Sequence, residues 1–144
     1  MSIDQQSVDE ALLAYAEAWN TPDAAKRREL LDIGLSDECS YTDPAYEVRG
    51  TEELADHIGR SLSGEAYDGL GAGARIPLSS GLDHYHGMFR FSWVLVDPQG
   101  EPQLEGMDFA ELAADGRLQC ITGFLGAFPP IPESWPEHLV WRGR

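Results

Sequence analysis

Apolar side chains recur at three- and four-residue steps near the start of the chain and at every second position further on. Val8, Leu12, Tyr15, Ala16 and Trp19 follow the first spacing. Positions three and four apart share one side of a helix, so this spacing predicts a helix over about residues 7–20 whose stripe faces a core.

A second helix and a short strand are predicted next. Thr21, Pro22 and Asp23 supply a helix cap, a first-turn proline and an acidic side chain near the positive helix end, and Gly34 is a stop signal. The helix is therefore expected to end at Gly34, before a short strand around residues 40–43.

A third helix is predicted from Thr51 onward. Leu54, Ile58 and Leu62 lie on one of its faces, and His57 lies next to that face. A glycine-rich connection over residues 64–73 follows, and this ends the helical part of the chain.

The later part of the chain has the period of strands. Pro77 weakens the strand pattern of residues 74–79, which favours a position at a sheet edge or a bulge. We predict strands over residues 74–79, 83–96, 103–113 and 117–127. The four prolines of residues 127–144 predict an extended tail with Trp135 and Trp141 as anchors. Helices followed by strands predict one α+β domain over residues 1–144.

Residues 83–96 alternate between two faces if they form one strand. We assign Tyr85, Phe89, Phe91, Trp93 and Leu95 to one face, and His84, His86, Met88, Arg90 and Ser92 to the other. His84, His86 and Arg90 on one face suggest metal or anion binding. A metal would need a third ligand that is not in view, so an interface on the outer sheet face is the favoured interpretation.

Composition excludes several kinds of partner. Lys and Arg total 10 against 25 Asp and Glu, which gives a net charge of -15, so nucleic acid and anionic membranes are repelled. No apolar stretch approaches a membrane span, and the N-terminus lacks the pattern of a signal peptide, so we expect a cytoplasmic protein.

Cys39 and Cys120 are read as small hydrophobic side chains, and no metal site or disulfide is predicted.

Two carboxyl groups lie inside or at the edge of apolar runs. Asp43 precedes Pro44, and Asp108 stands between Met107 and Phe109. Poor solvation disfavours the charged form of a carboxyl, and such groups concentrate at sites of proton chemistry or polar ligand binding. Asp43 is also compatible with an ordinary turn that bonds its own backbone, whereas a buried Asp108 needs a partner or neutralisation.

Several short motifs between residues 8 and 126 resemble one superfamily in their order and spacing. They are Tyr15–Asp23, Tyr41–Pro44, Arg49–Gly50, Gly106–Phe109, Asp115–Leu118 and Gly123–Phe124. Together they resemble the nuclear transport factor 2-like superfamily in its SnoaL-like branch. The resemblance implies a cone-shaped α+β barrel of three helices packed in a strongly curved antiparallel sheet, an apolar pocket between them, and a homodimer through the outer sheet face.

The steroid Δ-isomerases of this superfamily suggest catalytic roles. They use one Asp as a base and an oxyanion hole of a Tyr and a protonated Asp. The resemblance places Asp43 at the base, Asp108 at the protonated acid and Tyr15 at the oxyanion-hole tyrosine. Ile58, beside His57, replaces a supporting tyrosine of those enzymes, and Gly123 replaces an acid of the epoxide hydrolases.

Two hypotheses remain open. The chain is either a cofactor-independent isomerase or cyclase-like catalyst that acts on an apolar carbonyl compound, or a non-catalytic module that binds an apolar small molecule. In both cases we expect the ligand to contact further residues of the pocket, namely Trp19, His57, Ile58, Ile121, Gly123 and Leu125.

Overall fold

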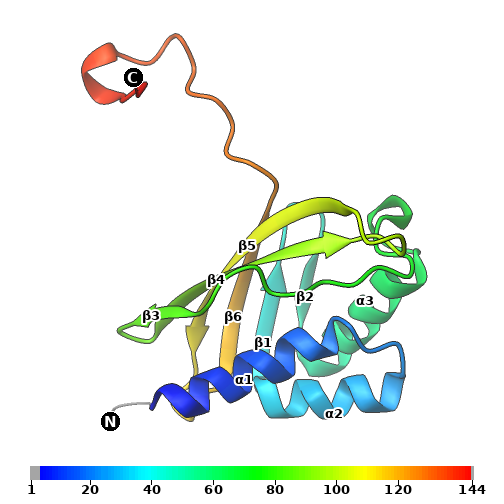
Figure 1. Ribbon diagram of the computed structural model, residues 1–144. Coiled ribbons are helices and arrows are strands. Elements are labelled where there is room, and N and C mark those ends of the chain that lie inside the picture. Colours follow the sequence, from blue (N-terminus) through cyan, green and yellow to red (C-terminus); the bar gives the residue numbers. More distant parts are fainter. Residues whose placement is uncertain (1–3, 144) are drawn as a thin grey trace.

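Three helices form the first part of the computed structural model, which describes residues 4–143. They are α1 (Gln5–Ala18), α2 (Ala24–Gly34) and α3 (Thr51–Ser63) (Figure 1). Asp4 caps α1, because its carboxylate accepts a hydrogen bond from the Ser7 amide. All three predicted helices are present.

Six strands form one curved sheet in the order β2-β1-β6-β5-β4-β3. They are β1 (Leu35–Thr42), β2 (Glu47–Arg49), β3 (Asp83–Tyr85), β4 (Met88–Val96), β5 (Pro102–Leu112) and β6 (Leu118–Leu125). Neighbouring strands are antiparallel except β1 and β6, which are parallel. The predicted α+β fold is confirmed, whereas a purely antiparallel sheet is wrong at this one pair.

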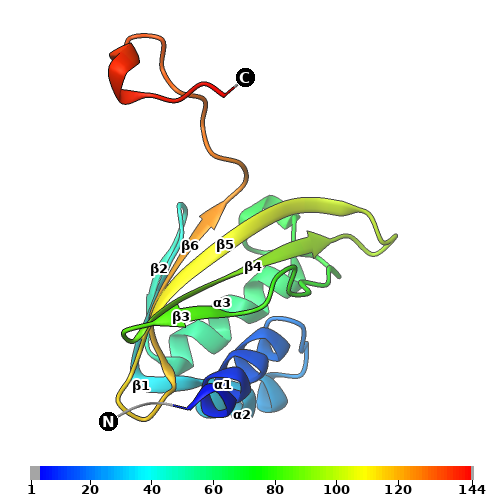
Figure 2. The ribbon, with the colours of Figure 1, turned by 60° about the vertical axis from the view of Figure 1, so that its left-hand side comes forward.

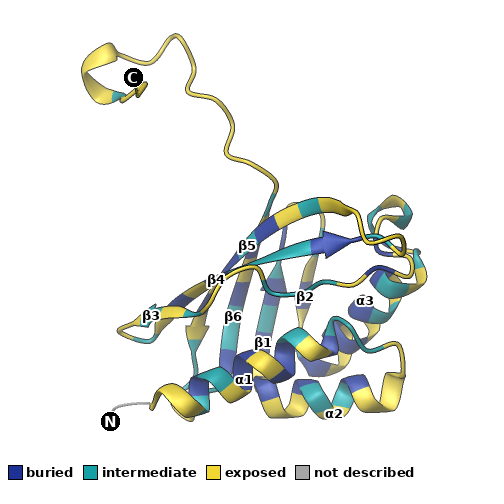
Figure 3. Cartoon of the chain, viewed as in Figure 1, coloured by how far each residue is buried: buried dark blue, intermediate teal, exposed yellow. Residues whose placement is uncertain are grey.

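The helices cover the concave face of the sheet (Figures 1 and 2). Side chains from both layers meet between them in one core that includes Leu12, Leu31, Leu54, Ile58 and Phe91. Figure 3 shows the buried positions where helices and sheet face each other. No helix within residues 4–143 is long and apolar enough to cross a membrane.

The predicted strand over residues 83–96 is a hairpin. His86 and Gly87 have positive φ angles of 50° and 75° and reverse the chain between β3 and β4, as a tight two-residue turn requires. The reversal changes two face assignments. Tyr85 pairs with Met88 and is 69% exposed, while His84 pairs with Phe89 and reaches Gln5 of α1 through a 2.6 Å hydrogen bond.

The grouping of His84, His86 and Arg90 on one outer face is therefore wrong. His84 lies on the side of α1, and His86 lies in the turn itself. The faces within β4 are as expected, because Phe89, Phe91 and Leu95 are buried and Met88 and Arg90 are exposed.

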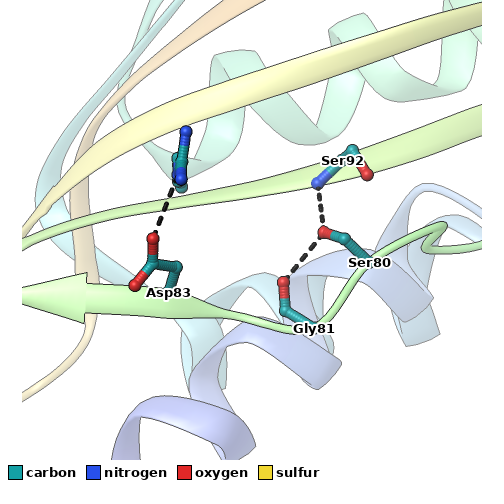
Figure 4. Close-up of polar contacts among 5 residues, drawn as sticks. Ser80, Gly81, Asp83 and Ser92 are labelled. Atoms are coloured by element: carbon teal, nitrogen blue, oxygen red, sulfur yellow. Dashed lines mark hydrogen bonds and ion pairs between the residues drawn. The ribbon is translucent and has the colours of Figure 1, made fainter.

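The segment over residues 74–79 runs beside β4 but is not a strand. It forms only isolated bridges, from Arg75 to Val96 and from Leu78 to Trp93, because Pro77 has no amide hydrogen to continue a ladder. Serine side chains complete the edge instead. The Ser80 hydroxyl accepts from the Ser92 amide and donates to the Gly81 carbonyl (Figure 4).

The start of α2 also differs from its prediction. Asp23 is at the cap position without a side-chain capping bond, and the helix starts at Ala24. The Thr21 hydroxyl instead donates to the Glu17 carbonyl at the end of α1, and the Pro22 carbonyl accepts from the buried Arg27 guanidinium. The three residues thus close one helix and hold the loop before the next.

The chain after β6 leaves the body of the molecule (Figure 1). It contains one short helical turn, η2 (Glu137–Leu139), and no strand up to residue 143. Trp135 and Trp141 are 55% and 76% exposed. They do not anchor the tail to the rest of this chain.

Gly106 leaves room for the large side chain of Trp93 on the neighbouring strand. Gly106 of β5 pairs with Trp93 of β4, and a Cβ atom at this glycine would overlap the indole ring. The absence of a side chain at Gly106 is therefore what allows Trp93 to lie flat across the sheet.

We expect Gly106→Ala to lower the free energy of unfolding by about 1–3 kcal/mol, because the indole must move out of its place. Gly81→Ala is the matched control, since a Cβ there meets no atom within 4 Å, and its effect should stay within about 0.5 kcal/mol. Urea denaturation measures both. Equal effects of the two variants would contradict this explanation.

Candidate functional site

A largely apolar cavity lies between α1, the segment after α3, and the inner face of β4 and β5. Its empty space is about 690 Å³, including the part that is open to solvent. Its apolar wall consists of Trp19, Leu70, Ile76, Leu78, Phe91, Trp93, Leu95, Leu104 and Leu125. The cavity suits a hydrophobic molecule of modest size.

Five side chains with ionisable groups reach this cavity. They are Tyr15 of α1, Tyr41 of β1, Asp43 just after β1, Tyr67 after α3, and Asp108 of β5. Polar groups that converge in an apolar pocket fix the orientation of a ligand, and they are the first place to look for chemistry.

Asp43 accepts four hydrogen bonds although it is only 8% exposed. Its Oδ1 accepts from the amides of Ala45 and Tyr46 at 2.8 and 2.9 Å. Its Oδ2 accepts from the hydroxyls of Tyr41 and Tyr67 at 2.8 and 2.5 Å. One oxygen thus forms the ordinary turn that the sequence allowed, and the other accepts from two phenols of the cavity wall.

Tyr67 is held in the cavity wall by unusual backbone angles. Tyr67 and Asp68 have φ angles of 55° and 54° and precede Gly69 at 85°, in the 3-10 turn η1 (Tyr67–Gly69). The left-handed region costs a non-glycine residue about 1–2 kcal/mol. The hydrogen bond to Asp43 and an edge-on contact with Tyr46, at 4.9 Å between ring centroids, hold this conformation.

His57 lies behind Tyr67, outside the cavity wall, and contacts its hydroxyl. Its Nε2 lies 2.7 Å from the Tyr67 hydroxyl, and its Nδ1 is buried without a partner. Burial lowers the pKa of His57; the charge of Asp43 opposes this effect and the charge of Arg60 adds to it. The ring is therefore neutral near pH 7.

Asp108 is also buried, but its carboxyl accepts fewer hydrogen bonds than that of Asp43. It is 4% exposed, and its Oδ1 accepts one hydrogen bond from Trp93 Nε1 at 3.0 Å. Burial raises the pKa of Asp108 to about 7; the bond from Trp93 opposes this rise, and the charge of Asp43 adds to it. Asp108 therefore keeps its proton at mildly acidic pH.

Gly123 makes room for this carboxyl. It is the partner of Asp108 across β5 and β6, and a Cβ atom there would lie 3.0 Å from Asp108 Oδ1 and 3.6 Å from the Tyr41 hydroxyl oxygen. A larger residue at Gly123 would push the two polar groups apart.

Tyr15 presents a hydroxyl with no partner in this structure. The side chain is 2% exposed, and its hydroxyl is one of three buried side-chain polar atoms without a partner among the described residues. Burial, followed by the charge of Asp108, raises the pKa of Tyr15 well above its usual value. Tyr15 thus stays a neutral phenol, and an unpaired buried donor is costly until a ligand accepts from it.

The structure brings most of the expected site residues to one cavity. Those in its wall are Tyr15, Trp19, Asp43, Asp108 and Leu125. His57 is one bond away behind Tyr67, and Gly123 lies under Asp108. Ile58 and Ile121 are buried in the core and are not part of the cavity wall.

Two tyrosines of the site were not singled out from the sequence. Tyr41 lies two residues before Asp43 on a strand, so it shares the inner face, and alternation alone could have indicated it. Tyr67 lies in a loop directly after Gly64–Ala66. Its left-handed backbone angles could not be predicted from the sequence, because tyrosine is not a residue that favours them. Within the described part of the chain, no three His, Cys, Asp or Glu side chains gather in a way that could hold a metal ion.

The structural relatives of this chain are SnoaL-like and nuclear transport factor 2-like proteins. A candidate isomerase of the SnoaL-like family from Agrobacterium tumefaciens has a TM-score of 0.74 and 27% identity, and the match covers 85% of this chain and 100% of that one. No family model and no curated protein matches the chain.

Two more distant structures show the fold alone. A protein of unknown function with a cystatin-like fold from Methylobium petroleophilum has a TM-score of 0.69 and 19% identity, over 94% of this chain and 84% of that one. A candidate SnoaL-like polyketide cyclase from Jannaschia has a TM-score of 0.61 and 15% identity, over 87% and 88%. The resemblance named from the sequence is confirmed.

The raised pKa of Asp108 makes a prediction about stability. The folded state holds this proton more tightly than the unfolded chain, so the stabilising effect is full below about pH 4 and is lost as pH rises to about 7. We expect the free energy of unfolding of the unmodified protein, minus that of Asp108→Asn, to fall by up to about 4 kcal/mol over this range.

Urea denaturation at a series of pH values measures this difference. Asp56→Asn is the control, because Asp56 lies on the exposed side of α3 and should show no such trend. A difference for Asp108→Asn that stays constant from pH 4 to pH 7 would show that Asp108 is not held in its neutral form.

Proposed function

We propose that this chain binds an apolar small molecule with a carbonyl group in the cavity between the helices and the sheet. One observation carries the proposal: Tyr15, whose buried hydroxyl has no partner, and Asp108, whose pKa is near 7, line the same apolar cavity. Both are donors when neutral, and a carbonyl oxygen is an acceptor that lacks donors of its own.

We propose further that the site removes a proton from the carbon next to that carbonyl. The C–H bond breaks, its electron pair forms the C=C bond of an enolate, and Asp43 takes the proton. Tyr15 and neutral Asp108 stabilise the oxygen that becomes negative. Return of the proton to another carbon gives an isomer. Attack by the enolate carbon on a second carbonyl of the same molecule, whose oxygen takes the electron pair and the proton from Asp43, gives a ring. The description of one structural relative, the candidate isomerase of the SnoaL-like family, supports this reaction class.

One observation favours the second candidate, binding without turnover. The four donors to Asp43 occupy both of its oxygens, so a donor must turn away before Oδ2 can accept a proton. A carboxylate held in this way also serves as a fixed part of a binding pocket. Catalysis and binding without turnover therefore differ only in whether a carbon-bound proton of the ligand exchanges.

Proton exchange in D2O separates the two candidates. The probe is decalone, a bicyclic ketone, and NMR follows the loss of hydrogen from carbons next to its carbonyl. We expect the protein to accelerate this exchange over buffer and Asp43→Asn to lower the acceleration by at least about 100-fold. Asp83→Asn, which breaks an exposed ion pair with Arg90, is the control and should exchange normally.

Two other results are informative. Decalone that shifts the resonances of cavity residues without exchange supports the binding module. Decalone that neither shifts them nor exchanges contradicts the proposal that this cavity takes a carbonyl ligand.

We also propose a homodimer through the outer sheet face. Phe109 and Phe124 pack edge-on there with centroids 5.8 Å apart, yet they are 40% and 58% exposed. Neighbouring Met88 and Tyr85 are also exposed, at 45% and 69%. Apolar area of this kind is commonly covered by a second copy.

Light scattering at micromolar concentration tests the assembly. We expect a dimer for the unmodified protein and a monomer for Phe124→Arg, because the change buries a charge in the interface. Phe128→Arg changes an exposed side chain of the tail and should leave the dimer intact. A monomeric unmodified protein would refute the proposal.

A further inference from the structure

The Tyr67 hydroxyl lies between two possible acceptors and has one proton. Asp43 Oδ2 is 2.5 Å away and His57 Nε2 is 2.7 Å away. An ionised carboxylate only accepts, so the phenol proton points to Asp43. His57 Nε2 must then carry a hydrogen and donate it to the phenol oxygen, which leaves Nδ1 as the bare nitrogen without a partner.

We propose that Tyr67 is a hydrogen-bond donor whose target changes with the protonation of Asp43: it donates to the carboxylate when Asp43 is ionised, and into the cavity, to the ligand, when Asp43 carries a proton. This inference rests on the proposed ligand cavity. It adds a third donor for the ligand to Tyr15 and Asp108.

The number of lone pairs on the phenol oxygen explains the change. When Asp43 Oδ2 gains a proton, it becomes a donor to Tyr67, while His57 Nε2–H continues to donate. Both acceptor positions of the phenol oxygen are then filled, and its own proton must turn toward the remaining side. Tyr67 is part of the cavity wall, and we infer that a ligand oxygen accepts on this remaining side. No bond of the ligand is made or broken in this step.

The titratable groups around this switch come from each neighbouring element. Tyr41 of β1 donates to the same Oδ2, and Asp108 of β5 interacts with the charge of Asp43. Tyr46 packs against both rings, and Arg60 of α3 acts on His57. Tyr41 is the other phenol beside Oδ2 to which the single proton of Asp43 can be donated, so a test must separate it from Tyr67.

Asp43→Asn reproduces the protonated state. The amides of Ala45 and Tyr46 donate to the Oδ1 position, so the amide oxygen of the asparagine must lie there. Its NH2 group then faces the two phenols and donates one hydrogen to each, including the one to Tyr67 that a protonated carboxyl would supply. The variant therefore holds the Tyr67 proton in the cavity permanently.

Binding of a fluorescent dialkylamino-naphthyl ketone tests the switch, because its emission moves to the red when its carbonyl accepts a hydrogen bond. We expect Asp43→Asn to bind this probe about tenfold more tightly than the unmodified protein, with red-shifted emission. The double variant Asp43→Asn, Tyr67→Phe should lose the gain.

The controls assign the gain to one phenol. The double variant Asp43→Asn, Tyr46→Phe should keep it, because the Tyr46 hydroxyl has no bond to the Asp43 carboxylate and only accepts a long bond of 3.5 Å from the Tyr67 amide. The double variant Asp43→Asn, Tyr41→Phe should also keep it. A gain that survives Tyr67→Phe, or no gain in Asp43→Asn at all, overturns the proposal.

A measurement on the unmodified protein decides the matter if the variants do not fold or the probe does not bind. Nitrogen NMR of labelled histidine, with His57 assigned by its loss in His57→Gln, should show hydrogen on Nε2 and a bare Nδ1. The opposite tautomer would mean that the Tyr67 proton points to His57, and the switch would not exist. This readout does not depend on turnover, so its failure differs from failure of proton exchange.

Discussion

Burying a carboxyl group in an apolar interior disfavours its charged form, and this chain buries two beside one cavity. The two solutions are different. Asp43 receives four hydrogen bonds, whereas Asp108 receives one from Trp93 and has its pKa raised to about 7 by burial. A buried carboxyl whose pKa is raised in this way is a usual basis for assigning an acid. The left-handed Tyr67 follows from this constraint, because its phenol supplies one of the four bonds.

Two glycines of the curved sheet leave space for these groups. Gly106 allows the Trp93 indole to lie across β5 and reach Asp108, and Gly123 leaves room for the Asp108 carboxyl beside Tyr41. The helices close the concave face and bring Tyr15 to the same cavity. The polar groups of the cavity thus come from α1, the sheet and η1. Two of their contacts, from Tyr67 to Asp43 and from Trp93 to Asp108, join residues 24 and 15 positions apart.

The sequence predicted the elements whose pattern is local and regular. Helical spacing indicated Tyr15, and polar residues inside apolar runs indicated Asp43 and Asp108, which all reach the cavity. Other features have no local signal. The turn at His86 lacks the usual Asn or Asp, so alternation continued through it, and the parallel pairing of β1 with β6 joins strands far apart in sequence. Tyr67 enters the site only because η1 bends back over α3.

The proposed ligand site depends most on Asp108 being neutral where an ordinary aspartate is charged. Carbon-detected NMR of the labelled side-chain carboxyls, followed from pH 3 to pH 9, measures this directly. We expect Asp108 to keep its proton at pH 5 and to titrate with a midpoint near 7. An Asp108 that is fully ionised at pH 5, with a midpoint near 4 as in an unfolded chain, would contradict it.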